Sequence, residues 1–323
     1  MRVGVGGTVP AMRALLVVNP NATTTSEQSR DLLVRALRSE VDLTVEYTMR
    51  RGHAVTLARD ATRAGVDLVV TLGGDGTVNE TVNGLLTGDR DPAHGADRRP
   101  LLAVVPGGST NVFARALGLP RDWAEGMQVI LRALRARRSR TIGLGRADDR
   151  YFTFCAGYGL DAEVVRRVER ARRKGKVSTA GLYVRSAVAQ YLTETDRRTP
   201  AITLASSGEP AEVGLASVIV QNTSPWTYVG EREIHACADA SFDTGLDVLG
   251  LKVLRMPGTT RLAAQLLRGR APVNGKQIVA LHDVYSFVLR ASRPMAFQLD
   301  GDYLGERGKV EFAAVPEAIR VVC

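Results

Sequence analysis

The amino-acid sequence predicts an α/β fold in two parts, a doubly wound parallel sheet followed by an all-β sandwich or barrel. Two observations predict this fold. Up to about residue 142, short apolar runs alternate with segments of helical periodicity, as expected for strands and helices around a parallel sheet. Beyond that point, short strand-like runs separated by turn residues dominate. We therefore expect a first domain over residues 12–142 and a second over residues 143–323.

The first part starts with a loose extension, residues 1–11, and then alternates strands with helices. Ser26 is expected to cap the first helix, because its hydroxyl can accept from a free backbone N–H. The polar segment 88–100 is expected to be a surface loop. The expected strands cover residues 14–18, 41–47, 67–72 and 101–105, and the expected helices cover 26–40, 53–64, the stretch ending at 86 and the stretch ending at 117.

The second part contains a helical stretch over residues 161–174 and a further helix that extends through Tyr191. The remaining segments are short, apolar and bounded by turn residues, which favours antiparallel strands. The expected strand-like runs cover residues 151–156, 212–221, 246–254, 277–291 and 295–299.

Composition limits the partners and the compartment. The net charge of +9 implies an anionic partner, and nucleic acid, anionic lipid and polyphosphate all qualify. An aromatic fraction of 5% argues against surfaces that stack bases. The apolar runs have strand length, and the first residues lack a signal-peptide pattern. Three widely spaced cysteines, Cys155, Cys237 and Cys323, suit a reducing compartment, so we expect a cytoplasmic protein.

Polar loops follow three of the expected strands. The first is Gly73-Gly74-Asp75-Gly76-Thr77, in which glycines would let the backbone approach phosphates and the next helix would supply free N–H groups. An Asp in such a loop implies a bridging Mg²⁺ or a proton-transfer role. The other two loops are 19–25 and 106–111. Because the carboxyl ends of parallel strands form the binding edge of open α/β sheets, the three loops together favour a ligand site over ordinary turns.

Several motifs combine into a family resemblance. Asn19-Pro20, Thr48 with Gly52-His53-Ala54, residues 73–79 and residues 106–114 resemble the diacylglycerol kinase catalytic-domain family of bacterial lipid kinases, which is related to sphingosine and ceramide kinases. Residues 242–248 resemble the family's D-G-x-L-D-V stretch, and Asp300-Gly301-Asp302 resembles its D-G-E. The Gly-Gly-Asp-Gly core is shared with NAD kinases and phosphofructokinases, so the downstream motifs make the resemblance specific.

The resemblance implies an ATP-dependent lipid kinase, with a nucleotide domain, a β-sandwich domain, and an active site in the cleft between them. It also implies that the last strand, around 319–323, returns to the first domain. The cofactors expected are ATP and Mg²⁺. The nucleotide site is expected at Asn19, Thr23, Thr48, Gly73, Gly74, Asp75, Gly76, Thr77, Asn79 and Ser109.

This sequence departs from the family pattern at three places. Val112 stands where the family has an acid, Thr244 stands at the D-G-x-L-D-V glycine, and Asp302 is one methylene shorter than the D-G-E glutamate. An upstream metal-binding acid of the family would fall on Ala240. We still expect an accessory metal site, because closely spaced carboxylates with an intervening Gly suit a hard cation. The alternative reading, which Ala240 and Thr244 favour, is a β-turn that an Asp caps. Its expected ligands are Asp243, Asp247 and neighbouring Asp239.

The lipid hydroxyl must lose a proton, and a carboxylate within hydrogen-bond reach is the usual acceptor. None of the histidines stands in a matching motif, so Asp75 and Asp300 are the candidates. Asp75 lies in the phosphate loop and is needed there for Mg²⁺ or phosphate positioning. Asp300 ends an apolar strand, and Gly301 would turn the chain so that Asp300 and Asp302 face the cleft. We therefore expect Asp300 to be the base, with Asp75 and Asp302 as the other catalytic residues.

A basic segment from Arg166 to Lys176 is expected to dock on an anionic membrane and make the protein membrane-peripheral. Seven basic residues stand there against one acid, Glu169. Each basic residue near an anionic surface contributes about 1 kcal/mol at most. A solvated charged helix is the alternative reading of this segment. The basic residues are Arg166, Arg167, Arg170, Arg172, Arg173, Lys174 and Lys176.

Three other functions stay open. A soluble-substrate kinase of the NAD kinase type would share the glycine core, and a non-catalytic regulator would bind nucleotide or lipid without turnover. A nucleic-acid module has the required charge but lacks a recognised motif, so we expect no nucleic-acid partner. The acceptor lipid, and whether the chain is a monomer or a homodimer, are not readable from the sequence.

Overall fold

The computed structural model describes residues 12–22, 26–88, 99–176, 179–196, 198–206, 210–270 and 272–323. The expected segment 1–11, most of the 88–100 loop, and Thr23 lie outside these residues. In the described part, no helix is long and apolar enough to cross a membrane.

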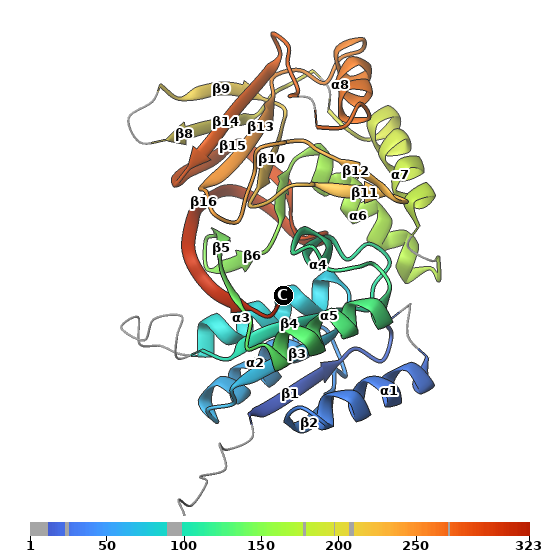
Figure 1. The fold of residues 1–323 in the computed structure, drawn as a ribbon. Coiled ribbons are helices and arrows are strands. Elements are labelled where there is room, and N and C mark those ends of the chain that lie inside the picture. The colour runs from blue at the N-terminus through green and yellow to red at the C-terminus, as the bar shows by residue number, and fades with distance from the viewer. Residues whose placement is uncertain are drawn as a thin grey trace, which may run out of the picture.

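A parallel sheet with helices on both faces forms the lower part of the molecule in Figure 1. Its strands lie in the order β4-β3-β1-β2, and their apolar residues form the core of this part. α2 packs on α3 on one face, and α1 lies beside α5 on the other. The elements are β1 (Arg13–Val18), α1 (Glu27–Arg38), β2 (Asp42–Tyr47), α2 (His53–Arg63), β3 (Leu68–Gly73), α3 (Asp75–Gly88), β4 (Leu101–Pro106), α4 (Val112–Ala116) and α5 (Trp123–Arg135).

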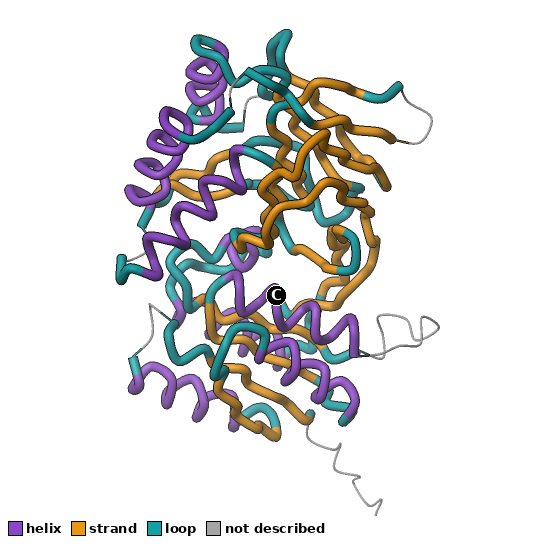
Figure 2. The backbone as a smooth tube through the Cα atoms, turned by 180° about the vertical axis from the view of Figure 1, so that it is seen from behind, coloured by secondary structure: helices purple, strands orange, loops and turns teal. Residues whose placement is uncertain are grey.

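The upper part is antiparallel. Its sheet follows the order β14-β13-β10-β7-β15-β16, and helices α6, α7 and α8 cover one side of it, as Figure 2 shows from behind. Its elements are β5 (Arg140–Ala147), β6 (Arg150–Phe152), β7 (Cys155–Tyr158), α6 (Leu160–Arg173), α7 (Ala180–Thr193), β8 (Ile202–Ser206), β9 (Glu212–Leu215), β10 (Ser217–Gln221), β11 (Thr227–Val229), β12 (Arg232–Ile234), β13 (Leu246–Leu251), α8 (Gly258–Leu266), β14 (Ile278–Val284), β15 (Ser286–Leu299) and β16 (Asp302–Val321).

Strand β16 joins the two parts into one 14-stranded sheet. It pairs antiparallel with β15 and β5, and its end turns alongside β4, where Val321 is the parallel partner of Leu102. The Val322 N–H then donates to the Leu102 carbonyl at 2.8 Å. The expected α/β fold with an antiparallel second part is confirmed. The boundary that we placed between residues 142 and 143 falls inside β5, a strand that pairs with β16.

Local forces explain the element boundaries. Ser26 caps α1 as expected and accepts from the Ser29 N–H at 3.2 Å. Helix α3 begins at Asp75, inside the pentapeptide that we expected to be a loop. The expected run 151–156 is split into β6 and β7, because the backbone at residues 153–155 turns its N–H groups to a buried carboxylate. Helices α6 and α7 match the expected ones, whereas α5 and α8 have no counterpart among the expected helices.

Candidate functional site

The two glycine-rich loops pack directly against each other at the carboxyl ends of β3 and β4. A Cβ added at Gly74 would stand 3.3 Å from the Gly108 Cα, and one added at Gly108 would stand 2.6 Å from the Gly74 Cα. At Gly73, an added Cβ would meet the side chain of Thr77 at 2.6 Å. Gly74 and Gly108 are therefore needed for the contact between the loops, and Gly73 is needed for the close approach of Thr77, in addition to any role toward a ligand.

Gly76 differs from the other loop glycines because its missing side chain faces the carboxylate of Asp302. An added Cβ there would meet nothing nearer than the two Asp302 carboxylate oxygens, each at 3.8 Å. Gly76 lies in the first turn of α3, where the backbone N–H groups and the helix dipole favour an anion. Beside it, Asn19 Nδ2 donates to Thr77 Oγ1 at 3.2 Å, which brings the β1 loop to this helix end.

Asp75 is half-buried and holds the next helix in place. Its Oδ2 and Oδ1 accept from the N–H groups of Val112 and Phe113, each at 3.1 Å, at the start of α4. Asn111 precedes this helix in a left-handed conformation and gives it no side-chain cap, so Asp75 supplies the missing acceptor. Burial raises the pKa of Asp75 to about 6, and the two backbone donors oppose this shift.

Asp300 is buried, with 5% of its surface exposed, and five donors surround its carboxylate. Its Oδ2 accepts from Asn79 Nδ2 at 2.7 Å and from the N–H and hydroxyl of Thr153 at 2.7 and 2.9 Å. Its Oδ1 accepts from the N–H groups of Phe154 and Cys155 at 3.0 and 3.1 Å. Burial raises the pKa of Asp300, and the backbone donors oppose the shift. These bonds leave the carboxylate no room for a substrate hydroxyl, which argues against the base role that we expected.

Asp302, two residues after Asp300, faces Gly76 at the start of α3. Asp300 and Gly301 form a two-residue turn between β15 and β16, and Asp302 is the first residue after it. Its Oδ2 lies 3.1 Å from Arg51 Nη2 and 3.7 Å from Arg150 Nη2. Arg51 comes from the loop after β2 and Arg150 starts β6, so the two parts of the chain each contribute one guanidinium.

Asn79 connects this cluster to α3. It is buried, donates to Asp300 and to the Tyr151 carbonyl, and accepts from Arg150 Nη2 at 2.7 Å. Asn79 therefore fixes Arg150 and Asp300 against α3. Its amide group is used for these contacts and does not point toward Gly76. We expected Asn79 in the nucleotide site, and the structure places it behind that site.

The other expected nucleotide residues are distributed along the same edge. Thr48 follows β2, with its N–H donating to the Val18 carbonyl at 2.8 Å, and Ser109 is exposed at the tip of the β4 loop. The Gly52-His53-Ala54 motif has a structural role: Glu80 on α3 accepts from the N–H groups of Gly52 and Ala54 at 2.7 and 3.2 Å. These bonds cap α2, whose N-cap residue Gly52 has φ +83°.

The expected accessory metal ligands are not brought together. Asp243 pairs with Arg140, its Oδ2 lying 2.6 Å from Arg140 Nη2. Asp247 is buried and accepts from the Asp283 N–H at 3.1 Å, with His282 Nδ1 at 2.8 Å. Asp239 is exposed. Within the described ranges, no group of three or more His, Cys, Asp or Glu side chains is placed to hold a metal ion. Asp243 and Asp247 are thus engaged by other partners, and the expected accessory metal site is not formed by these three residues.

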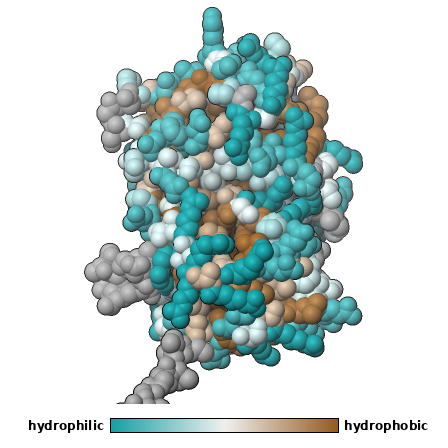
Figure 3. Space-filling model, in the orientation of Figure 1, coloured by the Kyte–Doolittle hydropathy of each residue, from teal (hydrophilic) through white to brown (hydrophobic). Residues whose placement is uncertain are grey.

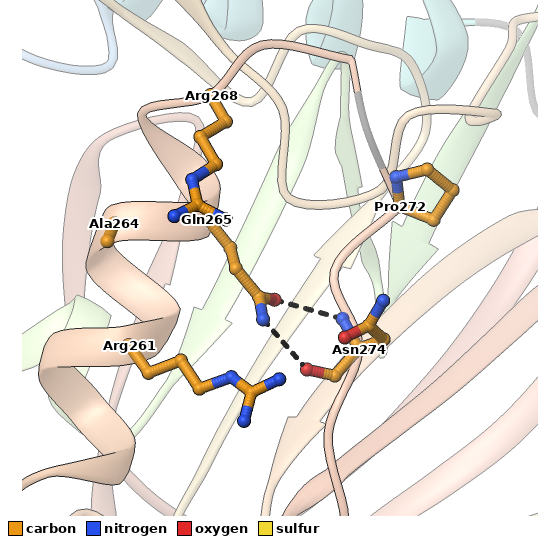
Figure 4. A pocket seen from close by; sticks show the side chains of 6 residues that line it. All are labelled: Arg261, Ala264, Gln265, Arg268, Pro272 and Asn274. Atoms are coloured by element: carbon orange, nitrogen blue, oxygen red, sulfur yellow. Dashed lines mark hydrogen bonds between the residues drawn. The ribbon is translucent and has the colours of Figure 1, made fainter.

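A separate hollow of about 520 Å³ lies against α8 at the top of the molecule, away from the glycine loops (Figures 1 and 4). Gln265 spans it by exchanging two 3.0 Å hydrogen bonds with the backbone of Asn274. None of the residues that line it was expected in the site. The lining residues are Arg261, Ala264, Gln265, Arg268, Pro272 and Asn274.

Comparison with known proteins supports one family. Residues 13–147 match the model of the diacylglycerol kinase catalytic domain. The chain is 31% identical over 268 residues to a diacylglycerol kinase of Bacillus subtilis, covering 78% of this chain and 79% of that protein. It is also 31% identical over 156 residues to a diacylglycerol kinase of Staphylococcus aureus, covering 47% of this chain and 45% of that protein. A crystal structure of a diacylglycerol kinase from Bacillus anthracis shares the fold, with a TM-score of 0.71, 19% identity and 98% coverage of both chains.

Proposed function

The chain belongs to the diacylglycerol kinase family and is a lipid kinase, and we propose that it transfers the γ-phosphate of ATP to the hydroxyl of diacylglycerol or a closely related lipid. The observation that carries this proposal is the position of Asp302. Its carboxylate faces Gly76 at the N-terminal end of α3, 3.8 Å from where a Cβ on Gly76 would stand, with Arg51 and Arg150 beside it. A candidate proton acceptor, a helix end that favours phosphate and two cations thus converge from separate segments.

The nucleotide phosphates fit the first turn of α3. Gly76 has no side chain to obstruct their approach, and the backbone N–H groups and the helix dipole favour their charge. Asn19 and Thr77 would border this site, and Ser109 and Thr48 would lie at its rim. Thr23 also remains in the proposal, although it lies outside the described residues. Mg²⁺ would neutralise charge on the phosphates. The described side chains offer no preformed group for it, so no step below depends on the metal.

Asp302 is the base in this proposal. The lipid hydroxyl oxygen attacks the γ-phosphorus, the bond to the bridging oxygen of ADP breaks, and the hydroxyl proton passes to the Asp302 carboxylate. Arg51 and Arg150 would stabilise the charge of the transferring phosphoryl group, as guanidinium groups do in other phosphoryl transfers. In the absence of substrate both arginines pair with Asp302, so phosphate binding would exchange one anionic partner for another.

Asp75 and Asp300 position the site. Asp75 fixes α4 and the β4 loop against the start of α3. Asp300 fixes the turn that carries Asp302, and ties it to Asn79 on α3. A misplacement of the turn by about 1 Å would cost the reaction about 10²-fold.

The membrane remains a proposed partner. The end of α6 and the turn after it expose Arg170, Arg172, Arg173 and Lys174. Three basic residues of the segment have acidic partners: Arg166 with Glu306, Arg167 with Glu194, and Arg173 with Glu169. The exposed remainder supports docking on anionic lipid.

The test is an incubation of the full chain with radiolabelled ATP, Mg²⁺ and single lipids in detergent micelles, with products resolved by chromatography. The lipids would be diacylglycerol, a sphingoid base, ceramide and phosphatidylglycerol, and NAD would be the soluble control. We expect labelled phosphatidic acid from diacylglycerol, formed at least about 10²-fold more slowly by the Asp302→Asn variant. Label on NAD alone, or equal label with the variant, would overturn the proposal.

A further inference from the structure

Helix α7 carries its apolar residues on the outside. Val184, Val188 and Leu192 stand at positions i, i+4 and i+8, which places them in one row along the helix. Their exposed fractions are 49%, 54% and 55%. We name this row the α7 ridge.

The inner face of α7 combines polar side chains with Tyr191, which packs against an apolar cluster. Gln190 is 1% exposed and donates to Glu163 Oε2 at 3.2 Å, and Ser186 is 6% exposed. The Tyr191 hydroxyl donates to the Leu254 carbonyl at 2.6 Å. A helix on the surface of a globular protein ordinarily turns its apolar row toward the core, whereas α7 exposes Val184, Val188 and Leu192. The contacts that hold α7 on the rest of the protein therefore do not involve the α7 ridge. In Figure 3, apolar surface shows at the upper right edge, where α7 lies in Figure 1.

Basic residues flank the ridge. Helices α6 and α7 form an antiparallel pair, in which Arg167 and Glu163 near the start of α6 contact Glu194 and Thr195 just beyond α7. The exposed basic end of α6 therefore lies beside the start of α7 and Val184. Arg185 on α7 is also exposed.

The same surface borders the proposed catalytic site. Glu169 on α6 accepts from the Tyr303 N–H at 3.1 Å and lies 3.7 Å from Arg51, the residue that pairs with Asp302. Arg173, one turn further along α6, pairs with Glu169 as well. Met49, two residues before Arg51, is 86% exposed. Arg173 on α6 and the exposed Met49 thus lie near the Arg51–Asp302 pair, one from each part of the chain.

We propose that the α7 ridge inserts into the headgroup region of an anionic membrane, with the basic end of α6 on the lipid phosphates, so that the site opens toward the bilayer. This inference rests on the proposed lipid kinase function, because a diacylglycerol acceptor resides in a bilayer. Charge complementarity identifies the occupant: an apolar row beside a group of cations matches an interfacial helix on anionic lipid.

The test is co-sedimentation of the full chain with phosphatidylcholine vesicles, with and without phosphatidylglycerol, at low and high salt. The ridge variant carries Val184→Ser, Val188→Ser and Leu192→Ser. We expect it to bind phosphatidylglycerol vesicles about tenfold or more weakly than the wild type, with the salt dependence retained. Arg170→Gln with Arg172→Gln and Lys174→Gln should instead reduce the salt dependence.

Matched controls remove exposed apolar side chains elsewhere. Leu32→Ser on α1 and Val213→Ser on β9 lose residues that are 56% and 68% exposed, and should leave vesicle binding unchanged. Equal binding by the ridge variant and the wild type would overturn the proposal. A change from dimer to monomer in sedimentation velocity, with vesicle binding intact, would also overturn it and identify a second copy of the chain as the occupant.

Activity separates this inference from the function on which it rests. With a short-chain diacylglycerol dissolved below its micelle concentration, the ridge variant should turn over as the wild type does, while its activity on vesicle-embedded diacylglycerol falls. Loss of both activities, with the fold intact by circular dichroism, would count against a membrane role for the ridge. Inactivity of the wild type toward every lipid would refute the kinase proposal, whereas vesicle binding would still report on the ridge.

Discussion

Asn79 and Asp300 lie 221 residues apart in the sequence, and Asn79 Nδ2 donates to Asp300 Oδ2 at 2.7 Å. The bond connects α3, which follows the first glycine loop, to the turn between β15 and β16. Both residues are buried, and the other donors to Asp300 come from residues 153–155. The geometry of the proposed active site therefore depends on one carboxylate that organises three separate segments.

Replacing Asp300 by Asn should destabilise the protein. The amide group would present a donor to N–H groups that now find an acceptor, and the unfolding free energy should fall by about 2–3 kcal/mol. Urea denaturation measures the change, with Asp243→Asn as the control. Asp243 makes an exposed ion pair with Arg140, so this control should alter stability by less than about 1 kcal/mol. An Asp300→Asn protein that is as stable as the wild type but inactive would return the base role to Asp300.

Replacing Asp302 by Asn should instead reduce the catalytic rate and leave the stability of the protein unchanged. We expect kcat to fall about 10²- to 10⁴-fold, because the amide cannot accept the hydroxyl proton. The melting temperature should stay close to that of the wild type, because the carboxylate is part of a solvent-accessible ion-pair cluster. Asp302→Glu, which restores the length found in the family motif, is the matched variant and should keep measurable turnover. Normal kcat in Asp302→Asn would exclude it as the base.

Gly76→Val should weaken ATP binding without unfolding the protein. The added atoms enter the space between α3 and Asp302, where the nearest atoms are 3.8 Å from a Cβ, and would occupy the proposed phosphate position. We expect at least about a tenfold loss of affinity by calorimetry, since helix N–H groups bind phosphate only at close approach. Gly108→Ala is the contrasting variant. Its Cβ would stand 2.6 Å from the Gly74 Cα, so stability should fall as well. If Gly76→Val binds ATP as tightly as the wild type, the phosphates do not bind beside Gly76.

Stability should fall as the pH rises from about 4 to about 6, and Asp161 should contribute to this dependence. Burial raises the pKa of Asp161 to about 6, and a 2.7 Å bond from Gln298 Nε2 opposes the shift. A raised carboxyl pKa means that the folded protein holds the proton more tightly than the unfolded chain. The stability that protonated Asp161 contributes is fully present when the pH lies below the pKa of Asp161 in the unfolded chain. It is lost as the pH rises through the pKa of Asp161 in the folded protein.

The matched variant is Asp161→Asn, which keeps an acceptor for Gln298. Relative to the wild type it should gain up to about 3 kcal/mol between about pH 4 and about pH 7. Urea denaturation at both pH values measures this difference. A pH-independent difference between the two proteins would show that Asp161 ionises normally.

The sequence predicted the strands of the first part well, because buried parallel strands are short apolar runs followed by polar loops. It also placed Asp75, Gly76 and Asp302 at one site. The role of Asp300 was not predictable, because its donors are backbone N–H groups of residues 153–155, which no side-chain pattern reveals. Likewise Arg51 and Arg150 converge on Asp302 only in the folded chain. An Arg in the segment after Thr48 was the available signal for the first of them.

The end of β16, around residues 319–323, was expected to return to the first part, whereas the rest of this long strand escaped prediction for a different reason. Over residues 302–321 its two faces are not divided into apolar and polar, because it passes from a charged exposed stretch into the core. For helix α7, the sequence predicted the helix but not which of its sides is buried. Periodicity predicts that residues up to Tyr191 are helical, but which side of the helix is covered depends on α6 and on Leu254.

The pairing of β16 with β4 has a consequence for biosynthesis. Residues emerge from the ribosome in order, and early domains generally fold first. Here the strand that covers the edge of β4 is made long after β4 itself. Until residues 319–322 arrive, the nascent first part carries an open strand edge of the kind that recruits other chains. Nascent chains stalled before residue 319 should therefore engage chaperones and aggregate more readily than chains that include this segment.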